Sequence, residues 1–399
     1  MSIDTPNGLN DQYSPIFDSE SNLTLISLPL DIINLISNQL DVQNFIKLST
    51  LNKTYRSFWF NKIFYKIKIS WSHLINPDDN SKLIKTFKHT TTQIRIIDSY
   101  SNGDWNLDIF EDFFWNFSKL RKIIYNTKNS SGWLKYRSND RITSLDLYYD
   151  PNQSRDIPLQ DRYGHSRPIK KVFNIEHLSN FKMLNTLSLN CYELNWDSNS
   201  IVYPVLMLEK LALKDCDWSY PFQLSYFNYN NSLKDLKVEL SQNFNHLLFS
   251  ERYSDFLAFN DNNNNGFNLN TLENLTIKFD NSPISNDDPI PKRTLNDNIL
   301  NKLLVSPDHL PNLRNLSLIN WKLHCSQENF TNCIKNSKSS ITKIYIQIIN
   351  YRFISHMYYN PNSILLMKIL FIQNQCKEEN PNLDFKIKFI DGWNETQHV

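Results

Sequence analysis

Hydrophobic residues recur along most of the chain in the pattern Leu-x-x-Leu-x-Leu, with polar residues between them. Copies of the pattern, some with Ile, Val or Tyr in place of Leu, start at positions 120, 142, 184, 208, 233, 272, 313 and 341, and shorter alternations stand at 94–96 and 385–389. The last two apolar positions of each copy are two residues apart, which is the period of a strand and not of a helix. We therefore expect a strand at each copy.

Apolar residues in the segments between these strands have helical spacing instead. The expected helices are 109–120, 172–184, 246–259, 299–305, 330–338 and 364–376. The copies that start at 184, 208 and 233 are 24 and 25 residues apart, and the steps to 272 and 313 are each longer by a polar loop. Strand and helix alternating at this period predict an α/β solenoid of irregular repeats.

The N-terminal part of the chain has a different pattern, because residues 28–40 predict a short helix. Pro29 suits its first turn, and Asp31 places a carboxylate near the positive end of the helix dipole. Its apolar residues fall on more than one stripe, and so short a helix cannot bury both against its few neighbours. We interpret the second stripe as a docking surface for another protein.

A second amphipathic helix is expected from Asn44, a good N-cap, through Tyr55, and a third apolar segment ends near Ile69. The chain is expected to divide into a disordered tail at 1–22, a helical domain at 23–70 and a solenoid at 71–399. Polar inserts near 150–171, 260–271 and 281–294 account for the irregular spacing of the copies.

Composition excludes several classes of function. The formal net charge of the 399 residues is +1, so no overall field attracts nucleic acid or an anionic membrane. Only six glycines are present, and no nucleotide-binding fingerprint, His-Glu-x-x-His motif or nucleophile elbow occurs. Five widely spaced cysteines without a Cys-x-x-Cys favour free thiols and no zinc site. With no signal segment or membrane span, we expect a cytoplasmic and/or nuclear, non-catalytic protein without metal or cofactor.

The N-terminal helical segment resembles the F-box, whose pattern opens with Leu-Pro-x-Glu/Asp and continues through a second helix to a basic and an aromatic position. Asn44, Leu51 and Asn52 depart from it, since Asp, Val and Ser or Cys are usual there. The pattern is matched by Leu28, Pro29, Asp31, Ile32, Ile33, Leu40, Phe45, Leu48, Leu51, Lys53 and Tyr55. Because the later copies resemble leucine-rich repeats, the chain is similar to a divergent fungal F-box protein with C-terminal repeats. The implied fold is a three-helix F-box followed by irregular leucine-rich repeats.

This resemblance implies the substrate-recognition subunit of an SCF-type (cullin–RING) ubiquitin ligase, which holds a target near the conjugating enzyme and does no chemistry itself. Its partners would be a Skp-family adaptor, cullin bound through that adaptor, and an unknown target protein. The expected adaptor contacts are Leu28, Pro29, Ile32, Ile36, Leu40 and Phe45, each of which could instead pack the helices together. Ile33, Leu48 and Leu51 are assigned mainly to the local core.

Strand side chains alternate, so the residues between the leucines would line the concave face of a solenoid and meet the target. The expected target-binding residues are Lys210, Lys214, Lys237, Lys278, Lys343 and Tyr345. Their lysine excess suits an acidic or phosphorylated target. A solvated sheet face without ligand preference is the simpler interpretation of the same residues.

Two other functions fit the sequence. In the first, the chain is a structural subunit of a complex outside ubiquitin transfer, such as one at a centromere or on chromatin, and a basic stripe such as Lys62, Lys66 and Lys68 contacts nucleic acid. In the second, the chain is a plain repeat scaffold and its first helices are only an N-terminal cap. The scaffold predicts that the apolar stripe of residues 28–40 is buried, whereas the F-box interpretations predict that part of it is exposed.

Overall fold

The structure, a computed structural model, describes part of the 399-residue chain. The described residues are 28–51, 53–97, 113–126, 134, 140–149, 159–160, 166–167, 170–195, 206–218, 224–228, 230–240, 269–279, 294–325, 327–349, 371, 373–375, 378 and 380–390. The chain divides into two compact units, residues 1–125 and 126–399. The expected tail at 1–22 and most of the three expected inserts lie outside the described residues.

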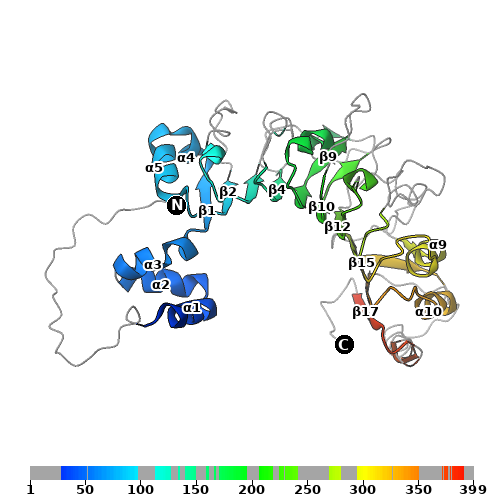
Figure 1. Ribbon diagram of the computed structural model, residues 1–399. Coiled ribbons are helices and arrows are strands. Elements are labelled where there is room, and N and C mark those ends of the chain that lie inside the picture. Colours follow the sequence, from blue (N-terminus) through cyan, green and yellow to red (C-terminus); the bar gives the residue numbers. More distant parts are fainter. Residues whose placement is uncertain are drawn as a thin grey trace. The chain divides into compact units, whose positions relative to one another are not determined.

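The first unit opens with three helices, α1 (Leu30–Gln39), α2 (Val42–Leu51) and α3 (Lys53–Ile63) (Figure 1). The second helix starts two residues earlier than expected, and the Oδ1 atom of Asp41 accepts a hydrogen bond from the backbone N–H of Asn44 at 2.7 Å. Asp41 therefore takes the N-cap role that the sequence suggested for Asn44. The third apolar segment is not helical to its end, because residues 66–70 form a strand.

Strands β1 (Lys66–Ser70), β2 (Gln93–Ile97) and β3 (Lys122–Asn126) of the first unit are parallel neighbours. Two helices connect β1 to β2, namely α4 (Trp71–Ile75) and α5 (Pro77–Phe87). The side chain of Asn76 caps α5 by accepting the backbone N–H groups of Asp78 and Asp79, and Pro77 fits the first turn, where no N–H is needed.

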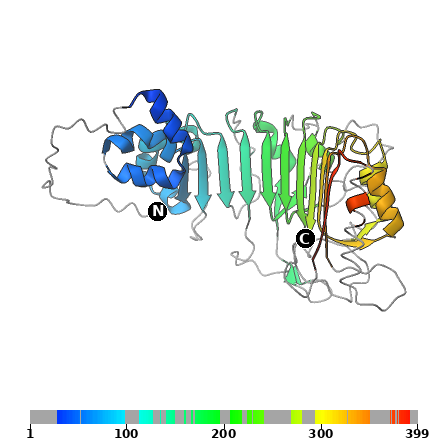
Figure 2. The same ribbon diagram turned by 90° about the horizontal axis from the view of Figure 1, so that it is seen from below.

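The second unit is built on parallel strands that pair in the order of the sequence, as Figure 2 shows. The strands are β4 (Ser144–Tyr148), β8 (Thr186–Asn190), β10 (Lys210–Lys214), β12 (Asp235–Leu240), β13 (Asn274–Phe279), β15 (Asn315–His324), β16 (Lys343–Ile349) and β17 (Asp384–Ile390). The register aligns equivalent positions of the repeated pattern, so that Leu187 lies opposite Leu145 and Leu211. Each strand therefore presents its leucines to one common core.

Shorter elements border this sheet. Strands β7 (Lys171–Asn174), β9 (Tyr192–Asn195) and β11 (Asp217–Trp218) form a small parallel sheet, β5 (Leu159–Gln160) pairs with β6 (Ser166–Arg167), and β14 (Thr294–Asn296) pairs with β15. The helical segments include the 3₁₀ turns η4 (Ile175–Asn180) and η5 (Leu224–Asn228), α9 (Asp297–Leu300), the π-helical turn η6 (Asn301–Val305) and α10 (Gln327–Lys335).

The core of the second unit consists of the residues that alternate inward along each strand. Two buried rows run across the sheet, and each member contributes about 1.5–3 kcal/mol through removal of its side chain from water. The rows are Leu145, Leu187, Leu211, Leu236, Leu275, Leu316, Ile344 and Phe385, and Leu147, Leu189, Leu213, Val238, Ile277, Leu318 and Ile346. Both rows are the apolar positions from which strands were expected.

The predicted fold class, a three-helix F-box followed by an α/β solenoid of leucine-rich repeats, is wrong. The described residues form an α/β fold dominated by a large parallel sheet with few helices. The prediction required a helix before each strand. Instead, residues 172–174 belong to β7 and 175–180 to a 3₁₀ turn, and only residues 113–115 of the segment expected at 109–120 are described as helix. The helix expected at 299–305 is present as the end of α9 followed by the π-helical turn η6, and the one expected at 330–338 overlaps α10 as far as Lys335. The segments 246–259 and most of 364–376 lie outside the described residues.

Candidate docking surfaces

The first candidate surface is on α1, which was expected to contact an adaptor. Ile33 is 5% exposed and packs with Trp59 of α3, which is 1% exposed, in a small hydrophobic cluster. Leu28 and Leu40, two of the expected adaptor contacts, are partly buried against this cluster. Their surface is therefore divided between the local core and solvent. The Phe45 side chain lies outside the described residues.

Apolar side chains on another stripe of α1 are open to solvent. Ile32 is 42% exposed and Leu35 is 62% exposed, while Ile36 is half-buried and Pro29 is exposed. Ile46 of α2 is 48% exposed. Leu35 and Ile46 were not among the expected adaptor contacts, although both side chains are exposed. Leu35 stands three residues after Ile32 and therefore lies on the same stripe of the helix.

The second candidate surface is the solvent-facing side of the large sheet in the second unit. The parallel register places alternate residues in rows, one of which runs from Lys210 through Asp235 to Asn274. A second row runs from Lys214 to Lys278, with Glu239 between them. On β16, Lys343 continues the first row, and Tyr345 belongs to the row of Lys237 and Thr276, which lies between the other two. All six expected target-binding residues therefore lie on strands of this face, at exposed or half-buried positions.

Several of the expected lysines have acidic partners on the same face. The Nζ atom of Lys210 lies 3.3 Å from Asp235. The Nζ atoms of Lys237 and Lys278 lie 2.8 Å and 3.7 Å from Oε1 of Glu239. Partial burial alone would raise the pKa of the Glu239 carboxyl, but the hydrogen bond and charge of Lys237 and the charges of the neighbouring lysines lower it below its ordinary value. The lysine excess is therefore partly neutralised within the sheet.

Hydrogen bonds between side chains extend the rows across the strands. The Asn274 amide donates to Asp235, and the Asn315 amide donates to the Asn274 oxygen at 2.5 Å. Such a ladder fixes the side-chain rotamers of three neighbouring strands, because each amide is held by the next. On β16 the Tyr345 hydroxyl lies 3.0 Å from Oε1 of Gln347, and burial raises the pKa of that phenol. The result is a rigid polar surface with protruding lysine ends.

A buried charge cluster lies where strands β8 and β10 end. The Nζ atom of Lys170 donates to the carbonyl oxygen of Asp215 at 2.7 Å and lies 3.2 Å and 3.0 Å from the carboxylates of Asp215 and Asp217. The Lys170 side chain is only 6% exposed. Burial would lower the pKa of its amine, but the two carboxylates outweigh burial and raise it above its ordinary value. Burial also raises the pKa of the Asp217 carboxyl, whose Oδ1 atom has no hydrogen-bond partner among the described residues.

Cys191 completes this cluster, because its thiol donates to Oδ2 of Asp215 at 3.3 Å. Burial and the adjacent carboxylate raise the pKa of the thiol well above its ordinary value. A protonated thiol beside a carboxylate is a poor nucleophile, so the geometry does not favour cysteine chemistry here. Cys191 and Asp215 both have positive φ, which turns the chain sharply at the strand ends. We therefore assign the cluster to structural anchoring of these two turns.

Within the described part of the chain, no group of three or more His, Cys, Asp and Glu side chains has an arrangement that could hold a metal ion. In the same residues, no helix combines the length and apolar character that a bilayer crossing requires.

Comparison of the chain with protein-family models and with curated proteins gives no match. The function must therefore be argued from the residues and surfaces of this chain.

Proposed function

We propose that the chain is a non-catalytic substrate-recognition subunit of a cullin–RING ubiquitin ligase. In this function the first two helices dock a Skp-family adaptor, and the solvent-facing side of the second unit's sheet binds the target protein. The single observation that carries the proposal is the exposed apolar stripe of α1, formed by Ile32 and Leu35. It occurs in the segment whose sequence matches the F-box pattern, where the resemblance implies adaptor contacts.

The geometry of α1 explains how one short helix serves both stability and docking. Ile33 faces Trp59 and ties the helix to α3, so the helix is held without its second stripe. Full burial of an exposed aliphatic side chain contributes about 1.5–3 kcal/mol. Ile32, Leu35 and Ile46 together could therefore contribute several kcal/mol to a protein complex, which is the range in which a few residues dominate an interface.

The target-binding side of the proposal rests on a preorganised polar surface. Fixed rows of side chains on parallel strands lose little conformational entropy when a partner binds. The ion-paired Lys210, Lys237 and Lys278 retain donors for a second acceptor, because an ammonium group has three N–H bonds. In this function the chain accelerates ubiquitin transfer by raising the effective concentration of target lysines near the conjugating enzyme.

A second candidate function is a structural subunit that uses the same adaptor in a complex without ubiquitin transfer. It is favoured by one observation, the group of basic residues on the strands of the first unit, which include Lys66 and Lys68. The two candidates make the same prediction for α1 and differ in whether cullin joins the complex.

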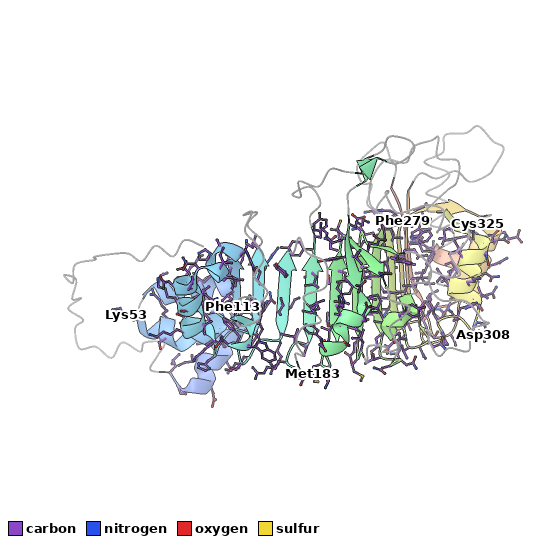
Figure 3. The ribbon with its side chains drawn as sticks, turned by 90° about the horizontal axis from the view of Figure 1, so that it is seen from above. Lys53, Phe113, Met183, Phe279, Asp308 and Cys325 are labelled. Atoms are coloured by element: carbon purple, nitrogen blue, oxygen red, sulfur yellow. The ribbon has the colours of Figure 1, made fainter. Side chains whose placement is uncertain are left out.

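The test compares the full chain with an Ile32→Asp/Leu35→Asp variant in binding to the purified Skp-family adaptor, with and without cullin. A matched control is Met183→Asp/Met207→Asp, which also places two carboxylates at apolar positions that are 56% and 53% exposed, but in the second unit. Figure 3 labels Met183. We expect wild type and control to bind adaptor and cullin, and the α1 variant to bind at least tenfold more weakly with an unchanged melting temperature.

Binding of the adaptor without cullin would favour the second candidate function, a structural subunit outside ubiquitin transfer. Absence of adaptor binding by the wild-type chain, or equal binding by the α1 variant, would overturn both functions and leave an interaction scaffold.

A further inference from the structure

One face of the strands in the first unit is strongly basic. The parallel register aligns Lys66 with Gln93 and Lys122 in one row, and Lys68 with Arg95 in the next. Inward-pointing residues on the same strands, such as Ile94 and Ile96, are fully buried. Because side chains alternate along a strand, the four cationic residues share the solvent-facing side. We call Lys66, Lys68, Arg95 and Lys122 the basic face.

The cations of the basic face are not neutralised within the described residues. Strands β1, β2 and β3 contain no Asp or Glu, and none of the four cations forms an ion pair in the described part of the chain. Among the side chains of the four, Lys66 makes a cation–π contact with the Tyr65 ring, with its Nζ atom 4.8 Å from the ring centroid. The contrast with the second unit is sharp, because there Lys210, Lys237 and Lys278 have acidic partners across the strands. A like-charged group of this kind gains free energy when an anionic group binds it.

The chain itself contains a segment of complementary charge. Residues 1–27 include Asp4, Asp11, Asp18 and Glu20 and contain no Lys, Arg or His. This segment also has apolar residues, among them Ile16 and Phe17. It is joined to the first helix of the same unit, so its effective concentration near the basic face is that of a tethered ligand, of millimolar order for a short linker. An extended chain spans up to about 3.4 Å per residue, so the eight residues from Glu20 to Leu28 reach about 27 Å.

We propose that the acidic N-terminal segment, residues 1–27, binds the basic face of β1, β2 and β3. The contact is intramolecular and electrostatic, and it is displaced by salt or by an acidic partner that competes for the same lysines.

A polypeptide suits this face better than a nucleic acid does. The residues between the cations on the strands are Gln93, Ser70 and the half-buried Ile97 and Ile124, and the aromatic ring that lies against a cation of this face is the half-buried Tyr65 beside Lys66. Proteins that bind single-stranded nucleic acid use several exposed aromatic rings on which successive bases stack, whereas the Tyr65 ring is half-buried and covered by Lys66. Aliphatic side chains beside cations instead match a segment such as 16–20, in which two apolar residues are followed by two acidic residues that flank a serine.

The test uses a fluorescent peptide of residues 1–27 and measures its binding to full-length chains by fluorescence anisotropy. The principal receptor is the full chain with Asp4→Asn/Asp11→Asn/Asp18→Asn/Glu20→Gln, whose own segment no longer competes. We expect it to bind the peptide at least tenfold more tightly than the wild-type chain does, and more weakly at 300 mM than at 50 mM salt. On the same background, Lys68→Gln/Arg95→Gln/Lys122→Gln should weaken binding at least tenfold.

The matched control removes three lysines of the same unit from helices instead of strands, as Lys53→Gln/Lys82→Gln/Lys85→Gln. All three are exposed, and Lys53 is labelled in Figure 3. The affinity of this variant for the peptide should stay within a factor of two of the affinity of the neutralised chain that retains the three lysines.

Three outcomes would overturn the proposal. The first is equal peptide binding by the wild-type and neutralised chains, which would show that residues 1–27 do not occupy the face, or binding by neither, which would show that the face does not bind this segment. The second is equal loss in the strand and helix lysine variants. The third is a single-stranded oligonucleotide that binds the wild-type basic face independently of residues 1–27, which would assign the face to nucleic acid.

Discussion

The Lys170 cluster allows a quantitative prediction about stability, because one buried cation serves two carboxylates. Replacing Lys170 with Met retains the length of the side chain and removes its charge. Each contact of about 3 Å between Lys170 and an Asp carboxylate contributes about 5 kcal/mol of Coulomb energy at an effective dielectric constant of about 20. The desolvation of the three charged groups offsets most of that Coulomb energy. The cluster therefore adds little net stability compared with apolar side chains in the same place.

Removal of the cation alone is costly, because it leaves two carboxylates without their partner. Breaking a buried pair in this way costs about 3–5 kcal/mol. Asp215 and Asp217 retain 28% and 33% exposure and can be partly rehydrated, so we expect a loss near the lower end, about 3 kcal/mol at pH 7.5. The assay is urea unfolding of the full chain followed by tryptophan fluorescence, with the transition of the second unit resolved from that of the first.

The pH dependence gives an independent check. Burial already raises the folded-state pKa of Asp217 above its unfolded value, although Lys170 lowers it. Without Lys170 the folded-state pKa of Asp217 rises further. The folded state then binds more protons than the unfolded state over a wider range of pH. Because of this, the stability of the variant falls as the pH rises through that range. The loss caused by Lys170→Met should therefore shrink between pH 7.5 and pH 4.5. A variant that also carries Asp217→Asn should recover about 1–2 kcal/mol at pH 7.5. A loss below about 1 kcal/mol, or an equal loss at both pH values, would refute the reasoning.

Three further predictions concern stability. Trp59→Ala should destabilise the first unit by about 3–5 kcal/mol, measured by urea unfolding, because Trp59 is 1% exposed. Leu187→Ala should lower the free energy of unfolding by about 2–5 kcal/mol, whereas Thr186→Ala, at an outward position, should change it by no more than about 0.5 kcal/mol. Equal losses would contradict the assignment of the two residues to opposite faces of the sheet. Burial lowers the pKa of Lys338 to about 8, so the folded state binds fewer protons than the unfolded state above that pH. Stability should rise between pH 8 and 10.5 in thermal melts, by up to about 3 kcal/mol, and Lys338→Met should remove the rise.

The strands were predictable from the sequence because their signal is local. Two apolar residues separated by one polar residue bury together only in an extended chain, so Leu187 and Leu189 indicate a strand whatever surrounds them. The helices between strands were not predictable in the same way. Val172 and Phe173 have apolar spacing compatible with a helix, but β-branched and aromatic residues also suit strands, and both residues pair with β9.

The candidate surfaces were only partly predictable, because charge neutralisation depends on contacts distant in sequence. Lys278 lies beside Glu239, which is 39 residues earlier, and this pair forms only when β12 and β13 adopt their parallel register. Segments of different length separate the strands, so sequence spacing alone does not give that register. The alternation of side chains along a strand was enough to place the lysines on one face, but their partial neutralisation depends on the register of the strands.

Docking and stability are separable in α1, and this separation makes the proposed function testable. Ile33 contacts Trp59 and holds the helix, whereas Ile32 and Leu35 are exposed and add little to the unit's own stability. A polar change at Ile32 or Leu35 should therefore reduce adaptor binding without unfolding the unit. A change at Trp59 should reduce both, because the exposed stripe keeps its geometry only while α1 stays packed on α3. If both kinds of change altered stability equally, the stripe would belong to the core and the adaptor function would lose its main support.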